Sequence, residues 1–234
     1  MNAFSMRMVV HRTIIYARKA SSTKSGSSKQ WLNRHVNDQY VKAAASQDLR
    51  ARSAFKLVEV QEKYKIIKPK NTVVDLGAAP GSWCDYVSKL QMADSKLVAV
   101  DLLKMEDVPN CKFIQGDFTS PRVQEAVLRY CDGKIDVLLS DMLGNTSGHG
   151  DHFRSIALAM EVLHFADKAL SPGGRILMKY LRGEDEVELL KAARSRFSSV
   201  KVVKPDASRK KSSEIYMLCT SFKKQTAIKK AKEA

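Results

Sequence analysis

Short apolar runs, separated by mixed polar segments, dominate the pattern of the chain. The runs are nearly continuous and rich in β-branched residues, which is typical of strands that are buried on both faces of a sheet. They predict strands at residues 72–76, 96–102, 112–115, 135–140 and 175–180, followed by two more at 200–203 and 214–222.

Segments with apolar residues at helical spacing lie between these runs. Ser53 is a candidate N-cap of the first segment, Pro121 suits the first turn of the third, and Ser-Pro-Gly-Gly after Leu170 ends the fourth. The alternation predicts an α/β fold, a mostly parallel seven-stranded sheet with helices on both faces. The predicted helices span residues 53–64, 83–91, 121–130, 156–170 and 184–197.

The chain has 234 residues, enough for one domain with a substantial core. Its formal charge of +15 and pI of about 9.7 favour a polyanionic partner, because Lys and Arg release counterions from phosphates. A nucleic acid is favoured over a membrane, since no stretch approaches the roughly 20 apolar residues that span a bilayer. A basic targeting segment is an alternative source of the charge.

The first 29 residues hold six of the basic side chains and no acid. This composition suits a mitochondrial presequence, but the helical amphipathicity is weak, and a basic RNA-binding arm is the alternative. We expect such a segment at residues 1–29, one folded domain at 30–224 and a basic tail at 225–234. The presequence predicts the mitochondrial matrix, with the nucleus, nucleolus or cytoplasm as alternatives.

Cysteine and histidine positions give no sign of a metal site. His149 and His152 have a spacing that could bind a metal, but no cluster of Cys or His accompanies them, and we expect no metal. The four cysteines form no C-x-x-C pair, and we interpret them as reduced core thiols of an intracellular protein. They are Cys84, Cys111, Cys131 and Cys219.

The strongest local signal is a buried strand that runs into a glycine loop and then a helix, at residues 73–83. Small residues there let a ligand approach the backbone closely. The spacing G-x-x-x-G, with an acid near the end of the strand, is more typical of S-adenosylmethionine sites than the G-x-G-x-x-G of nicotinamide enzymes. We therefore predict S-adenosylmethionine as the cofactor, bound by Asp75, Gly77, Pro80, Gly81 and Trp83.

Two further acids follow the next predicted strands. Asp101 lies where a carboxylate accepts hydrogen bonds from ribose hydroxyls, and Asp117 lies where it could meet an adenine amino group. Taken singly, each acid is better explained as a turn residue or a helix cap. Acids at three successive strand ends suit a cofactor that carries a sulfonium cation.

Several motifs occur together: Arg-Ala-Arg-Ser-Ala-Phe-Lys-Leu at 50–57, Asp-Leu-Gly-Ala-Ala-Pro-Gly-Ser-Trp at 75–83, Ser-Asp-Met at 140–142, Lys179, and Ser-Glu-Ile-Tyr at 213–216. This combination resembles the FtsJ/RrmJ family of ribosomal RNA 2′-O-ribose methyltransferases, from about residue 31 to residue 224. The resemblance implies a Rossmann-like class I methyltransferase fold with an antiparallel last strand.

The resemblance also implies a catalytic tetrad of Lys56, Asp141, Lys179 and Glu214, with Asp141 at the cofactor too. Topology supports their convergence, because Asp141 and Lys179 close adjacent parallel strands and an antiparallel last strand begins at the same edge. We hypothesise that Lys179 is the general base, with its pKa lowered by the nearby ammonium of Lys56. Asp141 would orient that amine, and Glu214 would hold Lys56 or the ribose.

The sequence departs from the family pattern at three places. The usual Asp-Met-Ala-Pro-Asn is Asp-Met-Leu-Gly-Asn at residues 141–145, the second loop glycine is Ser82, and Lys-x-Phe becomes Lys-Tyr-Leu at 179–181. No tetrad member is lost. The change at Leu143 and Gly144 lies beside the predicted site and bears on how the substrate fits.

Two basic segments flank this site, residues 19–52 with Trp31 and Tyr40 interleaved, and residues 209–211. Basic groups contact phosphates and aromatic rings stack on bases, so structured RNA is the predicted substrate, with a solvated basic surface as the alternative.

By resemblance, family members act on large-subunit ribosomal RNA, on transfer RNA or on precursor ribosomal RNA. The short form and the presequence-like start favour a monomeric mitochondrial enzyme that methylates a uridine ribose of large-subunit ribosomal RNA or of a pre-ribosomal particle. The alternatives are a ribosome-assembly factor that binds RNA and cofactor, a methyltransferase of transfer RNA ribose and, disfavoured by the glycine spacing, a dehydrogenase.

Overall fold

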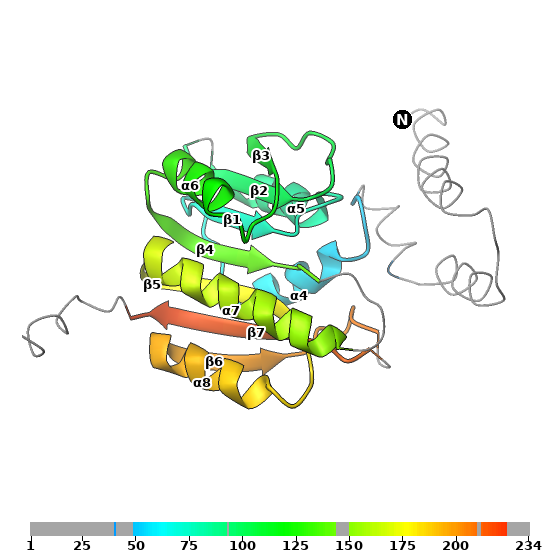
Figure 1. Ribbon diagram of the computed structural model, residues 1–234. Coiled ribbons are helices and arrows are strands. Elements are labelled where there is room, and N and C mark those ends of the chain that lie inside the picture. The colour runs from blue at the N-terminus through cyan, green and yellow to red at the C-terminus, as the bar shows by residue number, and fades with distance from the viewer. Residues whose placement is uncertain (1–39, 41–48, 93, 144–149, 210–211, 224–234) are drawn as a thin grey trace, which may run out of the picture.

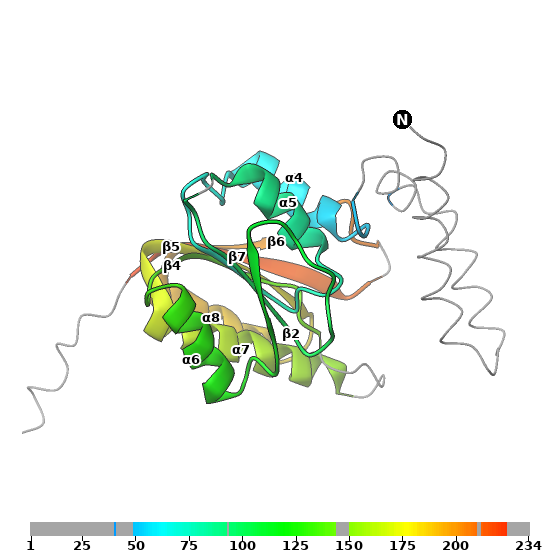
Figure 2. The same cartoon turned by 90° about the horizontal axis from the view of Figure 1, so that it is seen from above.

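The computed structural model describes residue 40 and residues 49–92, 94–143, 150–209 and 212–223. Within these ranges helices cover both faces of one seven-stranded sheet (Figure 1). In Figure 2, α4 (Ala54–Tyr64) and α5 (Ser82–Leu90) lie on one face of the sheet. The helices α6 (Pro121–Tyr130), α7 (Asp151–Ala169) and α8 (Glu186–Arg196) lie on the other face. The predicted α/β architecture is confirmed.

The strands lie in the order β3-β2-β1-β4-β5-β7-β6. β1 to β5 pair in parallel, whereas β7 lies antiparallel between β5 and β6, as predicted for the last strand. The strand order reverses between β1 and β4, and in such sheets ligands bind at the carboxyl ends beside the reversal. The bounds are Val73–Leu76, Leu97–Asp101, Cys111–Gln115, Ile135–Ser140, Leu170–Leu181, Phe197–Val203 and Glu214–Phe222 for β1 to β7.

Apolar side chains pack on both faces of the sheet. Leu57, Val87 and Leu139 belong to the cluster beneath α4 and α5, and Leu138 and Phe165 belong to the cluster beneath the other three helices. β1 lies between two paired strands and between two helical layers, so every residue in it is buried. A polar side chain on β1 is therefore withdrawn from water.

Some predicted boundaries were wrong. α7 ends at Ala169, as the Ser-Pro-Gly-Gly segment predicted, but β5 begins at Leu170 instead of at residue 175 and includes that segment, with a register shift against β4 between Ile135 and Val137. The irregular pairing accommodates the glycines, which a strand-like pattern does not reveal. α7 begins at Asp151 rather than at residue 156. The prediction missed the first turn because it is mostly polar and shows no apolar repeat. β6 likewise begins at Phe197, three residues before the predicted strand.

Several predictions fall outside the described residues, namely the targeting segment or basic arm at 1–29, the tail at 225–234, and Gly144, His149, Lys210 and Lys211. In the part of the chain that the structure describes, no helix is long and apolar enough to cross a membrane. The same part holds no group of three or more His, Cys, Asp or Glu side chains placed to bind a metal ion. Three of the four cysteines are buried, and Cys111 is partly exposed.

Candidate active site

The glycine loop after β1 takes a backbone shape that requires its two glycines. Gly77 and Gly81 have φ angles of 75° and 98°, in the region that side chains with a Cβ rarely adopt. A Cβ on Gly77 would lie 2.8 Å from the Met142 side chain, and one on Gly81 would lie 3.0 Å from Met105. The Ala79–Pro80 peptide between them is cis. The loop is thus tightly packed against the segments that follow β2 and β4.

Asp101 contacts this loop directly. Its Oδ2 accepts a hydrogen bond from the Ala79 N–H at 2.9 Å, and its Oδ1 accepts one from the Leu103 N–H at 2.8 Å. A carboxylate has about four lone-pair sites, so two backbone donors leave capacity for the ribose hydroxyls that we predicted as its partners. Asp101 therefore has a structural contact on the loop in addition to its predicted role.

Arg50 also contacts this loop. Its guanidinium pairs with Asp85 at 2.7 Å and donates to the carbonyl oxygens of Pro80, at 3.3 Å, and Glu106, at 2.8 Å. Sequence reasoning placed Arg50 in a matching motif but gave it no role. The guanidinium can bridge these elements because its donors are arranged in a rigid fork.

Asp75 of β1 has one carboxyl oxygen that accepts no hydrogen bond from the described residues. The residue is fully buried, and Cys84 donates to Oδ2 at 3.1 Å, whereas Oδ1 has no donor within the described part of the chain. The pKa of this carboxyl is raised to about 8, mainly by burial and also by the charges of Asp141 and Asp101, against the opposing effect of the Cys84 hydrogen bond. An unpaired buried acceptor beside the glycine loop suits a ligand that carries a positive charge or a hydrogen-bond donor.

The Trp83 side chain makes a structural contact that the sequence did not predict, whereas Asp117 makes the local contact that we considered as the alternative to cofactor binding. The Trp83 indole is buried and donates to the Ser53 carbonyl at 2.8 Å, which joins α4 to α5. Its backbone N–H belongs to the first turn of α5, where helices leave such groups without a helical partner. Asp117 accepts two hydrogen bonds from Thr119 through Oδ1, at 2.9 and 2.8 Å, in the local-turn arrangement that we considered as the alternative.

The N-terminus of α4 also differs from the prediction. Ser53 precedes the helix, but its side chain makes no capping hydrogen bond. Its Oγ lies 2.6 Å from the Oγ of Ser82, the residue that replaces the usual glycine of the loop. Both serines lie at helix N-termini, so this hydrogen bond connects the start of α4 to the start of α5.

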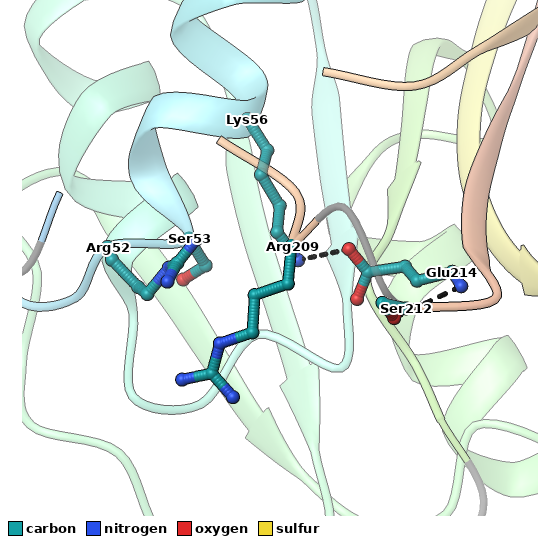
Figure 3. A pocket seen from close by; sticks show the side chains of 6 residues that line it. All are labelled: Arg52, Ser53, Lys56, Arg209, Ser212 and Glu214. Carbon is teal, nitrogen blue, oxygen red and sulfur yellow. Dashed lines mark hydrogen bonds and ion pairs between the residues drawn. The ribbon is translucent and has the colours of Figure 1, made fainter. Parts of the chain in front are cut away.

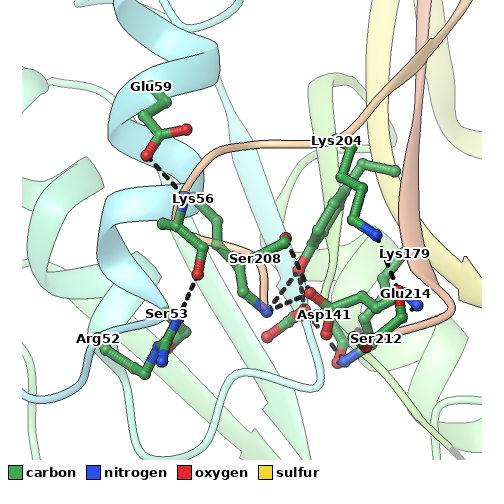
Figure 4. Close-up of polar contacts among 12 residues, drawn as sticks. Arg52, Ser53, Lys56, Glu59, Asp141, Lys179, Lys204, Ser208, Ser212 and Glu214 are labelled. Carbon is green, nitrogen blue, oxygen red and sulfur yellow. Dashed lines mark hydrogen bonds and ion pairs between the residues drawn. The ribbon is translucent and has the colours of Figure 1, made fainter. Parts of the chain in front are cut away.

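Asp141 and Lys179 form the first of two ion pairs at the carboxyl edge of the sheet (Figure 4). Asp141 directly follows β4, and its N–H donates to Leu76 of β1 at 3.1 Å. Lys179 comes from β5, is largely buried, and places Nζ 3.1 Å from Asp141 Oδ1 and 2.5 Å from the Asp141 carbonyl oxygen. Most lysines are solvated at the surface, but the amine of Lys179 is largely withdrawn from water.

Lys56 and Glu214 form the second ion pair. Lys56 Nζ, from α4, lies 2.6 Å from Oε1 of Glu214 at the start of β7. The same oxygen accepts a hydrogen bond from Ser208 Oγ at 3.0 Å. Both side chains of the pair are mostly buried, so solvent screens their attraction less than it would on an open surface.

Tyr216 connects the two ion pairs, and sequence reasoning gave it no role. Its hydroxyl donates to Asp141 Oδ1 at 2.6 Å and accepts from Lys56 Nζ at 3.2 Å. Burial, together with the charges of Asp141 and Glu214, raises the pKa of Tyr216 well above its ordinary value, so the hydroxyl keeps its proton. The strand alternation offered a signal, because residues 214 and 216 share a face of β7.

The structure thus brings all four tetrad residues together. We had expected the ammonium of Lys56 to act directly on Lys179. In the structure each lysine pairs with its own carboxylate, and the contacts from Lys56 to Lys179 run through Tyr216 and Asp141. Leu143, where the sequence departs from the family pattern, is exposed beside the site.

A glycine loop after β1, acids at the next strand ends and a polar cluster past β4 and β5 define a Rossmann-like methyltransferase fold. Comparison with known proteins narrows this class. The model of the FtsJ-like methyltransferase family matches residues 49–222, and the chain belongs to that family.

Individual relatives agree over most of their length. The chain is 42% identical over 212 residues to "Ribosomal RNA large subunit methyltransferase E" of Rickettsia bellii, with 88% of this chain and 93% of the relative covered. It is 43% identical over 207 residues to the protein of that name from Granulibacter bethesdensis, with 88% and 89% covered. A crystal structure described as a ribosomal RNA methyltransferase of Plasmodium falciparum matches with a TM-score of 0.66 and 30% identity, over 74% of this chain and 98% of that one.

Proposed function

We propose that this protein uses S-adenosylmethionine to methylate the 2′-hydroxyl of a ribose in large-subunit ribosomal RNA, and that the target is a uridine of mitochondrial ribosomal RNA. The observation that carries the proposal is the connected cluster Glu214, Lys56, Tyr216, Asp141 and Lys179 at the sheet edge that also holds the glycine loop. The names of the relatives support a ribosomal RNA substrate.

The residues around the glycine loop fit the predicted cofactor. The unpaired Oδ1 of Asp75 suits the ammonium of a methionine moiety, and Asp101 keeps acceptor capacity for ribose hydroxyls. Gly77 and Gly81 keep the backbone free of side chains where a ligand would approach. When bound, S-adenosylmethionine would supply a methyl group activated by its attachment to a sulfonium sulfur.

In this proposal Lys179 acts as the general base. As the neutral amine, its Nζ would take the proton of the ribose 2′-hydroxyl, a step that typically contributes about 10²–10⁴-fold to rate. Asp141 Oδ1, 3.1 Å away, orients this amine and stabilises the ammonium that results. Tyr216 and the Lys56–Glu214 pair hold Asp141 in place, so that much of the rate would come from positioning.

The test is methyl transfer from labelled S-adenosylmethionine to large-subunit ribosomal RNA or pre-ribosomal particles, with the product mapped to a nucleotide and an atom. We expect label on a uridine 2′-oxygen with the wild type and with Lys134→Ala, an exposed lysine at the opposite edge of the sheet. We expect loss of label with Lys179→Ala. Label on a nucleobase would overturn the ribose assignment. Cofactor binding without label on any RNA would favour an assembly factor, and label on transfer RNA would redirect the substrate.

The mitochondrial part of the proposal rests on the composition of residues 1–29, six basic side chains and no acid. A reporter fused to this segment should enter the mitochondrial matrix, and the same fusion with its arginines and lysines replaced by glutamine should not. Accumulation of the unaltered fusion in the nucleolus would instead support the basic RNA-binding arm.

A further inference from the structure

A basic pocket adjoins the tetrad and shares two of its residues. Its volume is about 230 Å³, and its lining residues come from the start of α4, the loop between β6 and β7, and the first residue of β7 (Figure 3). Two lining residues, Lys56 and Glu214, also belong to the tetrad. We call it the arginine pocket. Its lining residues are Arg52, Ser53, Lys56, Arg209, Ser212 and Glu214.

Positive charge in the arginine pocket exceeds negative charge. Among the described residues that line it there are three cations and one acid, and that acid is paired with Lys56 at 2.6 Å. The pKa of Arg52 is lowered by burial and then by the charge of Arg209, partly offset by Glu214. The guanidinium groups of Arg52 and Arg209 therefore repel each other, and an anion bound between them would offset this repulsion.

The loop that carries Arg209 is held against α4 by several contacts. Glu59 accepts hydrogen bonds from the N–H groups of Asp206, at 2.6 Å, and Ala207, at 2.9 Å, and Arg52 donates to the Ala207 carbonyl (Figure 4). Ser208 then contacts Glu214 at 3.0 Å. These contacts fix the backbone immediately before Arg209, so the pocket is a built feature of the fold.

The lining residues suit the phosphate of an RNA strand better than its bases. None of the described lining residues is aromatic or a large apolar residue, so the pocket offers no surface on which a base could stack. Guanidinium groups form paired hydrogen bonds with phosphate oxygens, and serine hydroxyls contribute further donors. Since the pocket and the tetrad share two residues, a phosphate bound there would adjoin the ribose at the tetrad.

We propose that the arginine pocket binds a backbone phosphate next to the ribose that is methylated, and that Arg209 is the residue that positions this phosphate. The proposal rests on the proposed function, because it takes the RNA strand as the substrate at the tetrad. It assigns Arg209 a role in holding the substrate and none in the proton transfer.

The experiment compares the wild type with Arg209→Ala, Arg209→Lys and the control Lys134→Ala. Equilibrium binding of large-subunit ribosomal RNA is measured at several salt concentrations, together with kcat, KM for RNA and affinity for S-adenosylmethionine. For Arg209→Ala we expect affinity and KM for RNA to worsen by about tenfold, kcat to change by less than about twofold, and the slope of binding against salt to fall by about one. Arg209→Lys should restore part of the affinity, and Lys134→Ala should match the wild type.

The outcomes separate this proposal from the proposed function. An Arg209→Ala protein with unchanged RNA affinity and salt slope overturns the phosphate site, even if the wild type methylates ribose. A loss of affinity for S-adenosylmethionine instead of RNA would reassign the pocket to the carboxylate of the cofactor. If the wild type fails to methylate a ribose, the proposed function fails, while the RNA-binding measurement still decides whether Arg209 contacts phosphate. Because Arg209 is exposed, we expect its variants to fold, and thermal melting tests this expectation.

Discussion

At the carboxyl edge of the sheet, Asp101 and Asp117 accept hydrogen bonds from residues close to them in the surrounding loops. On the other side of the reversal, Asp141 and Glu214 contact lysines that come from distant parts of the chain. These hydrogen bonds of Asp101 and Asp117 span at most 22 residues of sequence, whereas the two ion pairs span 38 residues or more and require β5 and β7 to be paired. A substitution in one region should therefore leave the function of the other measurable.

Asp141→Asn should have the largest effect, because Asp141 contacts both Lys179 and Tyr216. In the proposed mechanism, loss of its charge removes the group that orients Lys179, and we expect turnover to fall by about 10²–10³-fold. Single-turnover methyl transfer measures this effect. The control is Asp132→Asn, whose side chain is 79% exposed and pairs with Lys96, where turnover should not change. Equal losses in both variants would contradict the role of Asp141.

Gly81→Ala should break the cofactor region instead. The residue has a φ of 98°, and its new Cβ would lie 3.0 Å from Met105 and 3.1 Å from Arg50, so we expect affinity for S-adenosylmethionine to fall by about tenfold or more. Titration calorimetry measures the affinity. Gly133→Ala is a matched control, because its φ of 68° imposes similar backbone strain while nothing lies within 4 Å of the Cβ. If the control loses the same affinity, backbone strain alone explains the result.

Tyr216→Phe tests the connection between the two ion pairs. Removing the hydroxyl deletes its contacts with Asp141 and Lys56 but keeps the ring, so turnover should fall by about tenfold while stability changes by roughly 1 kcal/mol. Tyr180→Phe is the control, because the hydroxyl of Tyr180, on β5, makes a comparable hydrogen bond to Glu186 of α8 at 2.7 Å. Unchanged turnover in Tyr216→Phe would mean that the ion pairs hold each other without the tyrosine.

The remaining prediction concerns stability and its dependence on pH rather than activity. In the folded protein the pKa of Asp75 is about 8, and in the unfolded chain it is near 3.9, so the folded state binds an extra proton between these values. Stability from this source is fully present below the unfolded pKa and is lost as pH rises through the folded pKa. Relative to Asp75→Asn, the cofactor-free wild type should lose on the order of 2 kcal/mol, roughly 4–8 °C in Tm, between about pH 6 and pH 8.

Thermal melting across this pH range measures the Asp75 effect, and the exposed Asp132→Asn variant should follow the wild type. Parallel curves for the wild type and Asp75→Asn would show that the buried carboxyl is already ionised. The expected difference should shrink when a saturating cationic ligand occupies the site, because the ligand favours the ionised form.

The apolar runs predicted the strands well where both faces are buried, as at residues 135–140, because continuous burial leaves a continuous apolar signal. They failed for the start of β5, where glycines and a proline enter a paired strand. Topology also brought Asp141, Lys179 and Glu214 to one edge. Contacts between side chains, such as those of Tyr216 and Glu59, could not be predicted, because they depend on rotamers and on packing between elements distant in sequence.

The position of β7 between β5 and β6 has a consequence for the order in which the protein becomes active during synthesis. Lys56 and Tyr216 are separated by 160 residues, and β7 is the last strand of the described chain. The glycine loop and its flanking strands can form while the ribosome is still adding residues, because their partners are made early. The predicted tetrad is complete only when β7 lies between β5 and β6, so it can form only after the residues of the glycine loop and its flanking strands have been synthesised.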